Sequence, residues 1–279
     1  MATFTNQASL LYNNTRVASN TVTGTITETL TAAKTAVTQA YTAGEPVTYV
    51  LSLVNSGTAD LTGLTITDDL GTYTSGGLTL IPLDYVSGSA TYYSDGALQP
   101  APSVTAGDTL VIQGITVPAG GNAIVIYQAV PNEFAPPETG STITNTAAVT
   151  GQGITSVTAS ETIPAASVPV LSINKALSPA EVTGNSPITY SFVIGNTGSA
   201  PEAAAVIEDT FDPVLSDITV SVEGVPRTTD EYTYDEVTGE FATVQGAFTV
   251  PAADFVQDPQ TGAWSTVPGS VTVTVSGTV

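Results

Sequence analysis

The chain has 279 residues, which is enough for two domains of ordinary size that each bury a core. It carries 4 basic and 25 acidic side chains, and the formal net charge of −21 argues against binding to nucleic acid or to an anionic membrane surface. Cysteine and histidine are absent, which removes disulfides, thiol chemistry, the usual zinc sites and the commonest general base. We therefore expect neither an enzyme nor a cofactor or metal site.

The composition favours an all-β protein. Charged residues make up only 10% of a chain rich in Thr, Val, Ala, Gly and Ser, and no long stretch has helical periodicity. No apolar run approaches the roughly 18 residues that a membrane helix needs. No basic segment followed by an apolar one comes after Met1. We expect neither membrane insertion nor a standard secretion signal.

The N-terminal residues 4–10 alternate between apolar and polar types, which predicts a β-strand with one apolar face. The residues that share this face are Phe4, Asn6, Ala8 and Leu10. Residues 143–149 repeat the pattern, with Asn145 in the position of Asn6. We interpret residues 143–149 as the strand that closes the first domain. We interpret residues 4–10 as a donor strand that closes the second domain of a neighbouring molecule.

The chain is a duplication, because a set of residues in its first half returns 141 positions later. These residues are Lys34, Tyr49, Asn55, Gly57, Ile66 and Asp68, which correspond to Lys175, Tyr190, Asn196, Gly198, Ile207 and Asp209. In each copy, a strand runs into an Asn-x-Gly turn and is followed by a strand that ends in the aspartate.

The two copies differ at their ends. The strand at residues 122–127 matches residues 270–275, and the second copy carries an insertion before this strand. The first copy continues into the Asn145 strand and a further strand at residues 154–163, whereas the sequence ends at Val279 before any such strand. We predict a donor strand and turn in residues 1–20, a self-complete domain in residues 21–163, and a domain in residues 164–279 that lacks its last strand.

The only two lysines, Lys34 and Lys175, occupy the same place in the two copies. Each lies in the apolar phase of its predicted strand, so we expect both side chains to point into the core. Asp68 and Asp209 follow apolar strand residues in the same phase and should also point inward. Because lysine and aspartate are rarely buried unless they are paired, each domain is expected to contain a buried Lys–Asp pair.

This pattern resembles the repeated Ig-like domains of bacterial surface proteins. The features that carry the resemblance are a lysine in the first strand, an Ile-x-Asp strand after an Asn-x-Gly turn, and a final Thr-Asn-x-Ala strand. Related domains in Gram-positive adhesins and pili form an intramolecular isopeptide bond between a lysine and an asparagine, assisted by an acid. The resemblance implies two tandem Ig-like β-sandwiches, with a Lys34–Asn145 bond assisted by Asp68 in the first.

For the second domain, the resemblance implies a bond from Lys175, assisted by Asp209, to Asn6 of another subunit. The second domain departs from the pattern because it has no asparagine of its own in the required strand. Burial would lower the pKa of the lysine and raise that of the aspartate, giving a nucleophile and an acid. The alternative for each centre is a Lys–Asp ion pair that is hydrogen-bonded to an asparagine and forms no covalent bond. The alternative for the N-terminal strand is a frayed tail.

Two further features are open to more than one interpretation. Residues 230–240 form a predicted acidic hairpin that could bind calcium or could be a solvated turn. Trp264, in the insertion of the second copy, could be a carbohydrate platform or an inter-domain contact.

The predicted function is that of a structural subunit of a bacterial extracellular filament. Donor and acceptor lie at opposite ends of the molecule, so strand donation would join copies of this chain head-to-tail into an open polymer. Such a filament resembles Gram-positive pili or spore appendages, and we expect it on a cell or spore surface. The alternative is an adhesin or ligand-binding stalk module whose surface ligand, a glycan or a metal, is unknown. A monomer that feeds Asn6 into its own second domain is disfavoured by the intervening domain.

Overall fold

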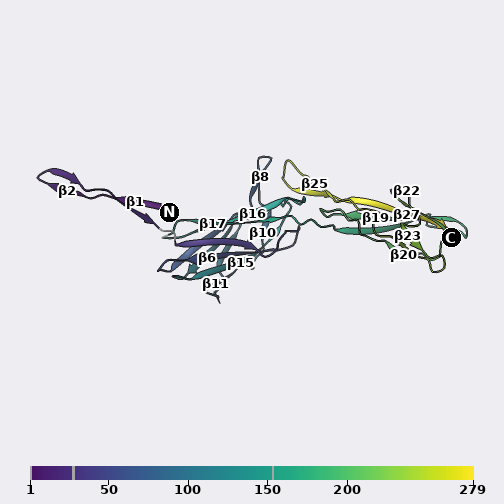
Figure 1. Cartoon of the computed structure of the whole chain (residues 1–279), viewed down its shortest axis with the longest axis horizontal. Helices are drawn as coiled ribbons and strands as arrows, with labels where there is room; N and C mark the ends of the chain where they lie inside the picture. The colour runs from purple at the N-terminus through teal and green to yellow at the C-terminus, as the bar shows by residue number, and fades with distance from the viewer. Residues whose placement is uncertain (1, 27–28, 153) are drawn as a thin grey trace.

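The computed structural model describes residues 2–26, 29–152 and 154–279. Every regular element in these ranges is a β-strand, so the prediction of an all-β protein is confirmed. The strands form an N-terminal arm and two β-sandwiches that follow one another along the long axis (Figure 1). No helix in the described ranges is long and apolar enough to cross a membrane.

The first sandwich is built from two antiparallel sheets. One sheet contains, in order, β12 (Ala97–Leu98), β11 (Thr91–Ser94), β15 (Asn122–Pro131), β6 (Val47–Asn55) and β5 (Leu30–Ala36), with β10 (Leu83–Tyr85) also paired to β15. The other contains β13 (Ser103–Ala106), β14 (Leu110–Val117), β7 (Leu61–Asp68), β16 (Thr142–Thr150) and β17 (Val157–Pro164). A separate hairpin of β8 (Tyr73–Ser75) and β9 (Leu78–Leu80) extends from this sandwich.

Alternating residues of these strands fill the first core. In β6, for example, Tyr49, Leu51 and Leu53 are buried, while the residues between them are more exposed. Each large apolar side chain that is fully buried contributes roughly 1.5–3 kcal/mol to folding. The β16–β17 hairpin completes this core, because β16 pairs with β7 and β17 lies against β5 of the opposite sheet. The first sandwich is thus closed along the side where its first and last strands meet.

The second sandwich has the same plan with fewer strands. Its larger sheet contains β18 (Leu171–Ser178), β19 (Pro187–Asn196), β27 (Gly269–Thr278), β21 (Ser216–Val222) and β22 (Val225–Pro226). Its smaller sheet contains β20 (Glu208–Thr210), β24 (Glu240–Thr243) and β23 (Tyr232–Tyr234). The hairpin of β25 (Asp254–Gln257) and β26 (Trp264–Val267) forms the insertion. A separate cluster of buried apolar residues forms the core of this sandwich.

The repeated Asn-x-Gly turn has a structural cause. The buried Asn55 side chain donates hydrogen bonds to backbone carbonyls of two neighbouring turns and accepts one from the Gly57 N–H at 2.9 Å. Asn196 makes the equivalent bonds and accepts from the Gly198 N–H at 2.9 Å. A Cβ atom on Gly198 would lie 2.2 Å from the Val168 carbonyl oxygen, so a side chain does not fit there. The two turns therefore hold equivalent loops of the two sandwiches in the same way.

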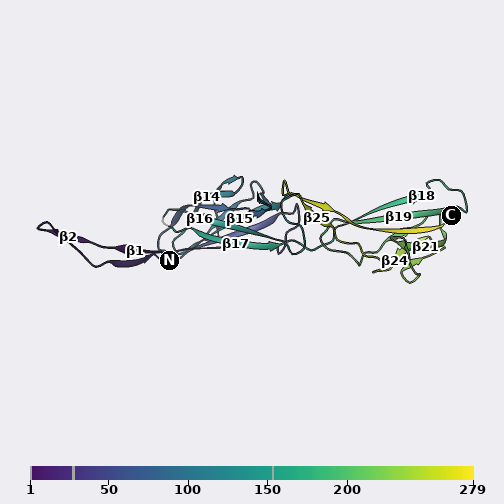
Figure 2. The same cartoon turned by 90° about the horizontal axis from the view of Figure 1, so that it is seen from above.

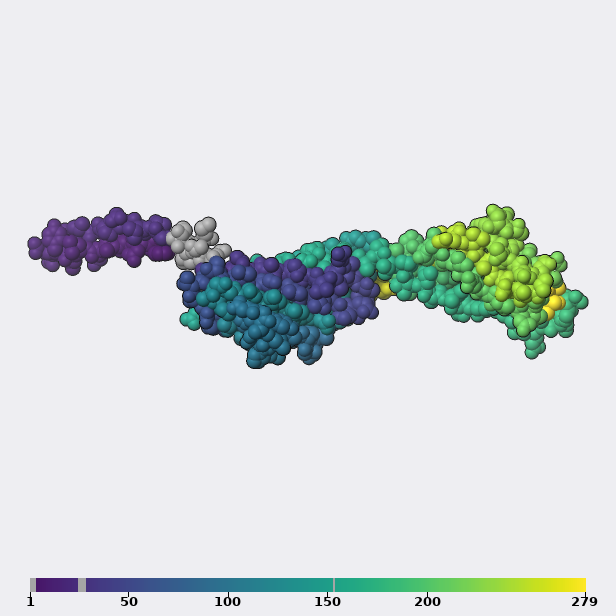
Figure 3. Space-filling model, turned by 60° about the horizontal axis from the view of Figure 1, so that its bottom comes forward, coloured from purple at the N-terminus to yellow at the C-terminus, as the bar shows by residue number. Residues whose placement is uncertain are grey.

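The N-terminal arm is one long hairpin. β1 (Ala2–Asn6) pairs with β4 (Val22–Ile26), and β2 (Ser9–Tyr12) pairs with β3 (Thr15–Ala18). The turn between β2 and β3 has positive φ at Asn13 and Asn14, 45° and 59°, as a type I′ turn requires. The arm extends away from the first sandwich, on the side opposite to the second (Figure 3). Because β4 pairs with β1, the N-terminal element continues past the predicted boundary at residue 20.

The insertion braces the two sandwiches against each other (Figure 2). In the β25–β26 hairpin, Gln257 accepts a hydrogen bond from the Ser75 hydroxyl of the β8–β9 hairpin at 2.9 Å. The backbone N–H of Trp264 donates to the Glu133 carbonyl at 2.8 Å. The Leu80 side chain lies directly over Gly262. The insertion therefore makes an inter-domain contact, to which Trp264 contributes through its backbone.

Candidate functional site

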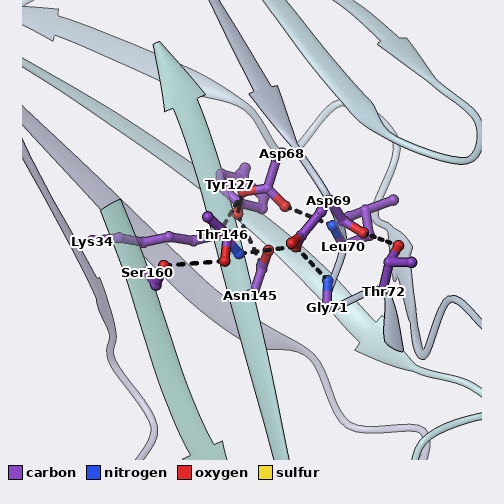
Figure 4. Close-up of polar contacts among 10 residues, drawn as sticks. All are labelled: Lys34, Asp68, Asp69, Leu70, Gly71, Thr72, Tyr127, Asn145, Thr146 and Ser160. Carbon is purple, nitrogen blue, oxygen red and sulfur yellow. Dashed lines mark hydrogen bonds and ion pairs between the residues drawn. The ribbon is translucent and has the colours of Figure 1, made fainter. Parts of the chain in front are cut away.

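The first candidate centre lies between the two sheets of the first sandwich. Lys34 extends from β5, whereas Asp68 at the end of β7 and Asn145 on β16 face it from the other sheet (Figure 4). Tyr127 on β15 completes the group. Each of the four lies in the buried phase of its strand, and Lys34 is only 4% exposed. The structure therefore brings together Lys34, Asp68 and Asn145, the three residues singled out from the sequence.

The four side chains form a connected chain of polar contacts. Lys34 Nζ lies 2.5 Å from Asp68 Oδ2, and the Tyr127 hydroxyl donates to the same oxygen at 2.6 Å. Asn145 Nδ2 donates to the Tyr127 hydroxyl at 3.2 Å. The other carboxylate oxygen of Asp68 accepts the backbone N–H of Leu70 at 3.0 Å. Asp68 is thus fixed at the centre, and Tyr127 connects it to the carboxamide of Asn145.

Burial sets the proton affinities in this centre. It lowers the pKa of the Lys34 amine from its ordinary value, and the adjacent Asp68 carboxylate opposes that shift. Burial also raises the pKa of the Tyr127 hydroxyl, and the Asp68 charge adds to the effect. Within the described ranges, Asn145 Oδ1 has no hydrogen-bond partner. The centre therefore holds an amine that gives up its proton more readily than usual, next to a carboxamide whose oxygen is open to an acid.

Tyr127 was not among the residues predicted from the sequence. The only signal was its position as the last residue of the apolar phase of residues 122–127, which is equally typical of a core tyrosine. Its ring does pack in the core, 5.5 Å from the Tyr49 ring, and the hydroxyl alone makes the polar contacts.

The second candidate centre contains an equivalent ion pair that is not enclosed. Lys175 on β18 contacts Asp209 on β20, and its Nζ atom lies 4.6 Å from the centre of the Tyr190 ring. The Lys175 side chain is 41% exposed and that of Asp209 is 17% exposed. The prediction that Lys175 is buried is therefore wrong for the isolated chain, although the predicted pair forms. The cause is that no part of the described chain covers the outer side of β18, every residue of which is exposed.

An apolar hollow lies beside this second centre. It has a volume of about 210 Å³ and is lined chiefly by Leu171, Ile173, Ile194, Ile207 and Phe248. Leu171 and Ile173 are 40% and 59% exposed, which is unusual for aliphatic residues in the inward phase of a strand.

In the first sandwich, the β16–β17 hairpin occupies the corresponding place. Val149 of β16 is fully buried and pairs with Ile66, the counterpart of Ile207. The hollow in the second sandwich therefore has the position of a missing hairpin.

The β1–β4 part of the arm has the same strand register as that hairpin, whereas β2–β3 is offset by one residue, since Leu10 pairs with Val17 and its counterpart Val149 with Val157. Asn6 pairs with Val22, 16 positions along the chain (22 − 6), and Asn145 pairs with Glu161, also 16 positions along (161 − 145). The arm exposes the large apolar residues of its predicted inward face, with Phe4 at 54% and Leu10 at 64%. The predicted donor is thus half of a two-stranded element, and both of its strands have counterparts in the first sandwich.

The acidic hairpin of residues 230–240 uses its central carboxylate locally. Asp235 accepts the backbone N–H groups of Val237 and Thr238 at 2.7 and 3.2 Å, as a turn-capping aspartate does. No group of three or more potential metal ligands was found in the described part of the chain. The solvated-turn interpretation accounts for these contacts.

Comparisons with known proteins give similarity at the level of fold. No protein-family model matches the chain, and no curated protein does. Among solved structures, the major pilin subunit BcpA of Bacillus cereus is 14% identical over 96% of this chain and 73% of its own, with a TM-score of 0.35. The full-length major pilin SpaD of Corynebacterium diphtheriae is 12% identical over 85% and 59%, with a TM-score of 0.37. The collagen-binding subdomain ACE19 of Enterococcus faecalis surface protein ACE is 12% identical over 50% and 99%, with a TM-score of 0.30.

These three structures are pilins and an adhesin domain, and an enzyme that catalyses macrocyclization, AvmM, matches with a similar TM-score of 0.31. Only the fold is matched, at low identity, and neither an assembly mode nor a chemistry follows from it.

Proposed function

We propose that the chain is a structural subunit of a bacterial extracellular filament, in which the arm of one subunit completes the second sandwich of the next. Lys–Asn isopeptide bonds would form within and between subunits. The observation that carries the proposal is the pair of unmatched surfaces, an exposed apolar hairpin and an uncovered apolar hollow. The β16–β17 hairpin in the first sandwich is an internal example of the same fit.

The first sandwich supplies the expected register of the contact. There, Ala147 pairs with Asp68 and Val149 with Ile66 as β16 lies against β7. Asn145, two residues before Ala147, then reaches the Lys34 centre.

In the same register, Ala8 of the arm would pair with Asp209 and Leu10 with Ile207. The Leu10 side chain would fill the hollow, where burial of a leucine stabilises by roughly 1.5–3 kcal/mol. Asn6 would lie beside Lys175, as Asn145 lies in the first centre. The added backbone pairing would satisfy the N–H and C=O groups at the free edge of β20.

The same geometry favours a linear polymer. The arm joins the chain before the first sandwich, whereas the hollow belongs to the second, so each contact uses two different surfaces. A heterologous contact of this kind propagates into an open chain unless the rotation between subunits closes a ring. A net charge of −21 would keep finished filaments apart from one another. We propose the surface of a cell or spore as the place where the filament is displayed.

Denaturing gel electrophoresis after boiling tests the proposal. We expect a ladder of multimers from the wild-type chain, and only monomer from Lys175→Ala or Asn6→Ala. Lys34→Ala is the matched control, because it removes the other lysine and should leave the ladder in place. Negative-stain electron microscopy of the same samples tests assembly separately from covalent linkage. Monomeric protein at high concentration, with no ladder and no filaments, would rule out the proposed function.

A second candidate function is favoured by the junction between the sandwiches. A hollow of about 390 Å³ lies there, lined in part by Tyr41, Pro137, Val170 and Phe255. Concave, mostly apolar sites between domains are common ligand sites, so the chain could be a ligand-binding module of an adhesin. Specific retention on a glycan array by a chain that does not polymerise would favour this function.

A further inference from the structure

In both Lys–Asp centres, aromatic rings lie close to the amine of the lysine. In the first, Lys34 Nζ lies 4.9 Å from the Tyr49 ring and 5.8 Å from the Tyr127 ring. In the second, Lys175 Nζ lies 4.6 Å from the Tyr190 ring, 5.6 Å from the Phe192 ring and 5.5 Å from one more ring. The ring at 5.5 Å belongs to Phe211, which stacks on Tyr190.

Phe211 takes the place of Tyr127 from another part of the fold. The strand position that matches Tyr127 is Val275, since Tyr127 pairs with Tyr49 and Val275 with Tyr190. The Phe211 ring lies 4.8 Å from the Tyr190 ring, much as Tyr127 stacks on Tyr49 at 5.5 Å. The second centre therefore keeps a stacked ring at this place and lacks the hydroxyl that Tyr127 supplies in the first.

We infer that Tyr127 is a catalytic proton relay in the Lys34–Asn145 reaction, and that the centre of the second sandwich forms its bond more slowly because Phe211 has no hydroxyl. This inference rests on the isopeptide chemistry of the proposed function. Its basis is the position of the Tyr127 oxygen, which donates to Asp68 at 2.6 Å and accepts from the leaving nitrogen of Asn145 at 3.2 Å.

The relay gives a balanced reaction. Lys34 first transfers a proton to Asp68 across the 2.5 Å contact, leaving a neutral amine and a carboxylic acid. The amine nitrogen forms a bond to Asn145 Cγ, and the bond from Cγ to Nδ2 breaks. Tyr127 gives its proton to Nδ2 and takes one from Asp68, so the nitrogen leaves as ammonia. Asp68, which has given its proton to Tyr127, then takes the surplus proton from the new amide nitrogen and is protonated again.

The environment of Tyr127 suits a relay rather than a permanent acid. Burial and the neighbouring Asp68 raise its pKa, so the hydroxyl loses a proton only when another replaces it. In the second centre, Asp209 would have to reach the leaving nitrogen of Asn6 without such an intermediary. Loss of a positioned acid–base group typically costs about 10²–10⁴ in rate.

The test is the time course of bond formation after cell-free synthesis, quenched in acid and followed by intact mass. We expect the wild-type chain to lose one ammonia from the first sandwich, and Tyr127→Phe to do so at least about 100-fold more slowly while folding at the normal rate. Tyr92→Phe is the matched control, because it removes another buried tyrosine hydroxyl of this sandwich, one that donates to the Thr116 carbonyl at 2.5 Å. Loss of ammonia from Tyr127→Phe at the wild-type rate would overturn the relay and leave the isopeptide bond intact.

A second measurement needs no variant of Tyr127. In wild-type protein at concentrations where filaments have already assembled, the ladder of covalent multimers should appear later than the ammonia loss within the first sandwich. Equal rates at the two centres would overturn the inference. A wild-type chain that never loses ammonia would rule out the isopeptide chemistry itself, and the relay with it.

Discussion

Each sandwich contains a Lys–Asp pair beside two stacked aromatic rings, and the two centres differ most in what covers them. In the first, the β16–β17 hairpin encloses the centre, and the Lys34 side chain is 0% exposed. In the second, the equivalent side is open and the Lys175 side chain is 41% exposed. The comparison shows that a Lys–Asp pair forms without the hairpin, whereas its burial requires one. A covering strand therefore controls how strongly the environment acts on the lysine.

The largest expected effect is on the proposed contact between subunits. Leu10 and Leu11 are adjacent in β2 and are 64% and 63% exposed, so a charge at either position should be tolerated in the monomer. In the register of the first sandwich, only Leu10 would enter the hollow. We expect Leu10→Asp to weaken assembly by roughly a thousandfold or more, because burying an unpaired carboxylate costs several kcal/mol.

Leu11→Asp is the control for this prediction. It adds the same charge one position away, at the counterpart of the exposed Thr150, and should leave assembly close to that of the wild type. Sedimentation velocity at matched concentrations would measure both variants. Equal behaviour of the two would contradict the proposed register, even if filaments still form.

A smaller effect is expected within the first sandwich. Asn145→Ala removes the predicted bond to Lys34, which would close a loop of 111 positions (145 − 34). By analogy with a disulfide closing a loop of that size, its loss should lower the free energy of unfolding by about 4–5 kcal/mol. Urea unfolding measures this, with Asn122→Ala on the exposed end of β15 as control. A loss of only about 1 kcal/mol, typical of a single hydrogen bond, would point to the non-covalent ion pair.

The smallest effect is on pH dependence. In Asn145→Ala, Lys34 remains a titratable amine whose pKa burial lowers below the ordinary 10.5. The folded state then releases this proton at a lower pH than the unfolded state, so stability rises with pH between the two pKa values. In the wild type, the lysine is part of an amide and does not titrate. The difference in free energy of unfolding between the wild type and Asn145→Ala should therefore decrease as the pH rises, by about 1.4 kcal/mol per unit of pKa shift. Unfolding at a series of pH values from neutral to 10.5 measures it. A constant deficit would show that Lys34 does not titrate differently in the two proteins.

Much of the fold and the first centre was predictable from local patterns. Strand alternation put Lys34, Asp68 and Asn145 in the inward phase, and a sandwich has only one interior in which inward residues can meet. The 141-position repeat then identified Lys175 and Asp209. The phase of a residue, however, says which way it points and not whether anything covers it. The exposure of Lys175 follows instead from the last strand that the second domain was predicted to lack, and strand phase alone does not take that strand into account.

The aromatic residues of the two centres could not be predicted from the sequence either. Tyr127 and Phe211 occupy equivalent space although they come from different positions of the repeat. Such a replacement depends on how a loop after β20 packs across the core, which no local periodicity encodes. Alignment of the repeats pairs Tyr127 with Val275. The alignment therefore does not show that Phe211 lies at the place of Tyr127.

The bracing hairpin β25–β26 has a mechanical consequence for a filament of these subunits. Inside each chain, it ties the second sandwich back to β8–β9 of the first. At a junction between chains, the first sandwich has the short turn at residues 118–121 in place of the β25–β26 hairpin. This turn is held by an internal hydrogen bond of 3.0 Å. In the second sandwich of the preceding subunit, only residues 211–215 connect β20 to β21, at the place that the β8–β9 hairpin has in the first sandwich. Stiff and compliant joints would therefore alternate, and the persistence length of the filament would be set by the joints between subunits.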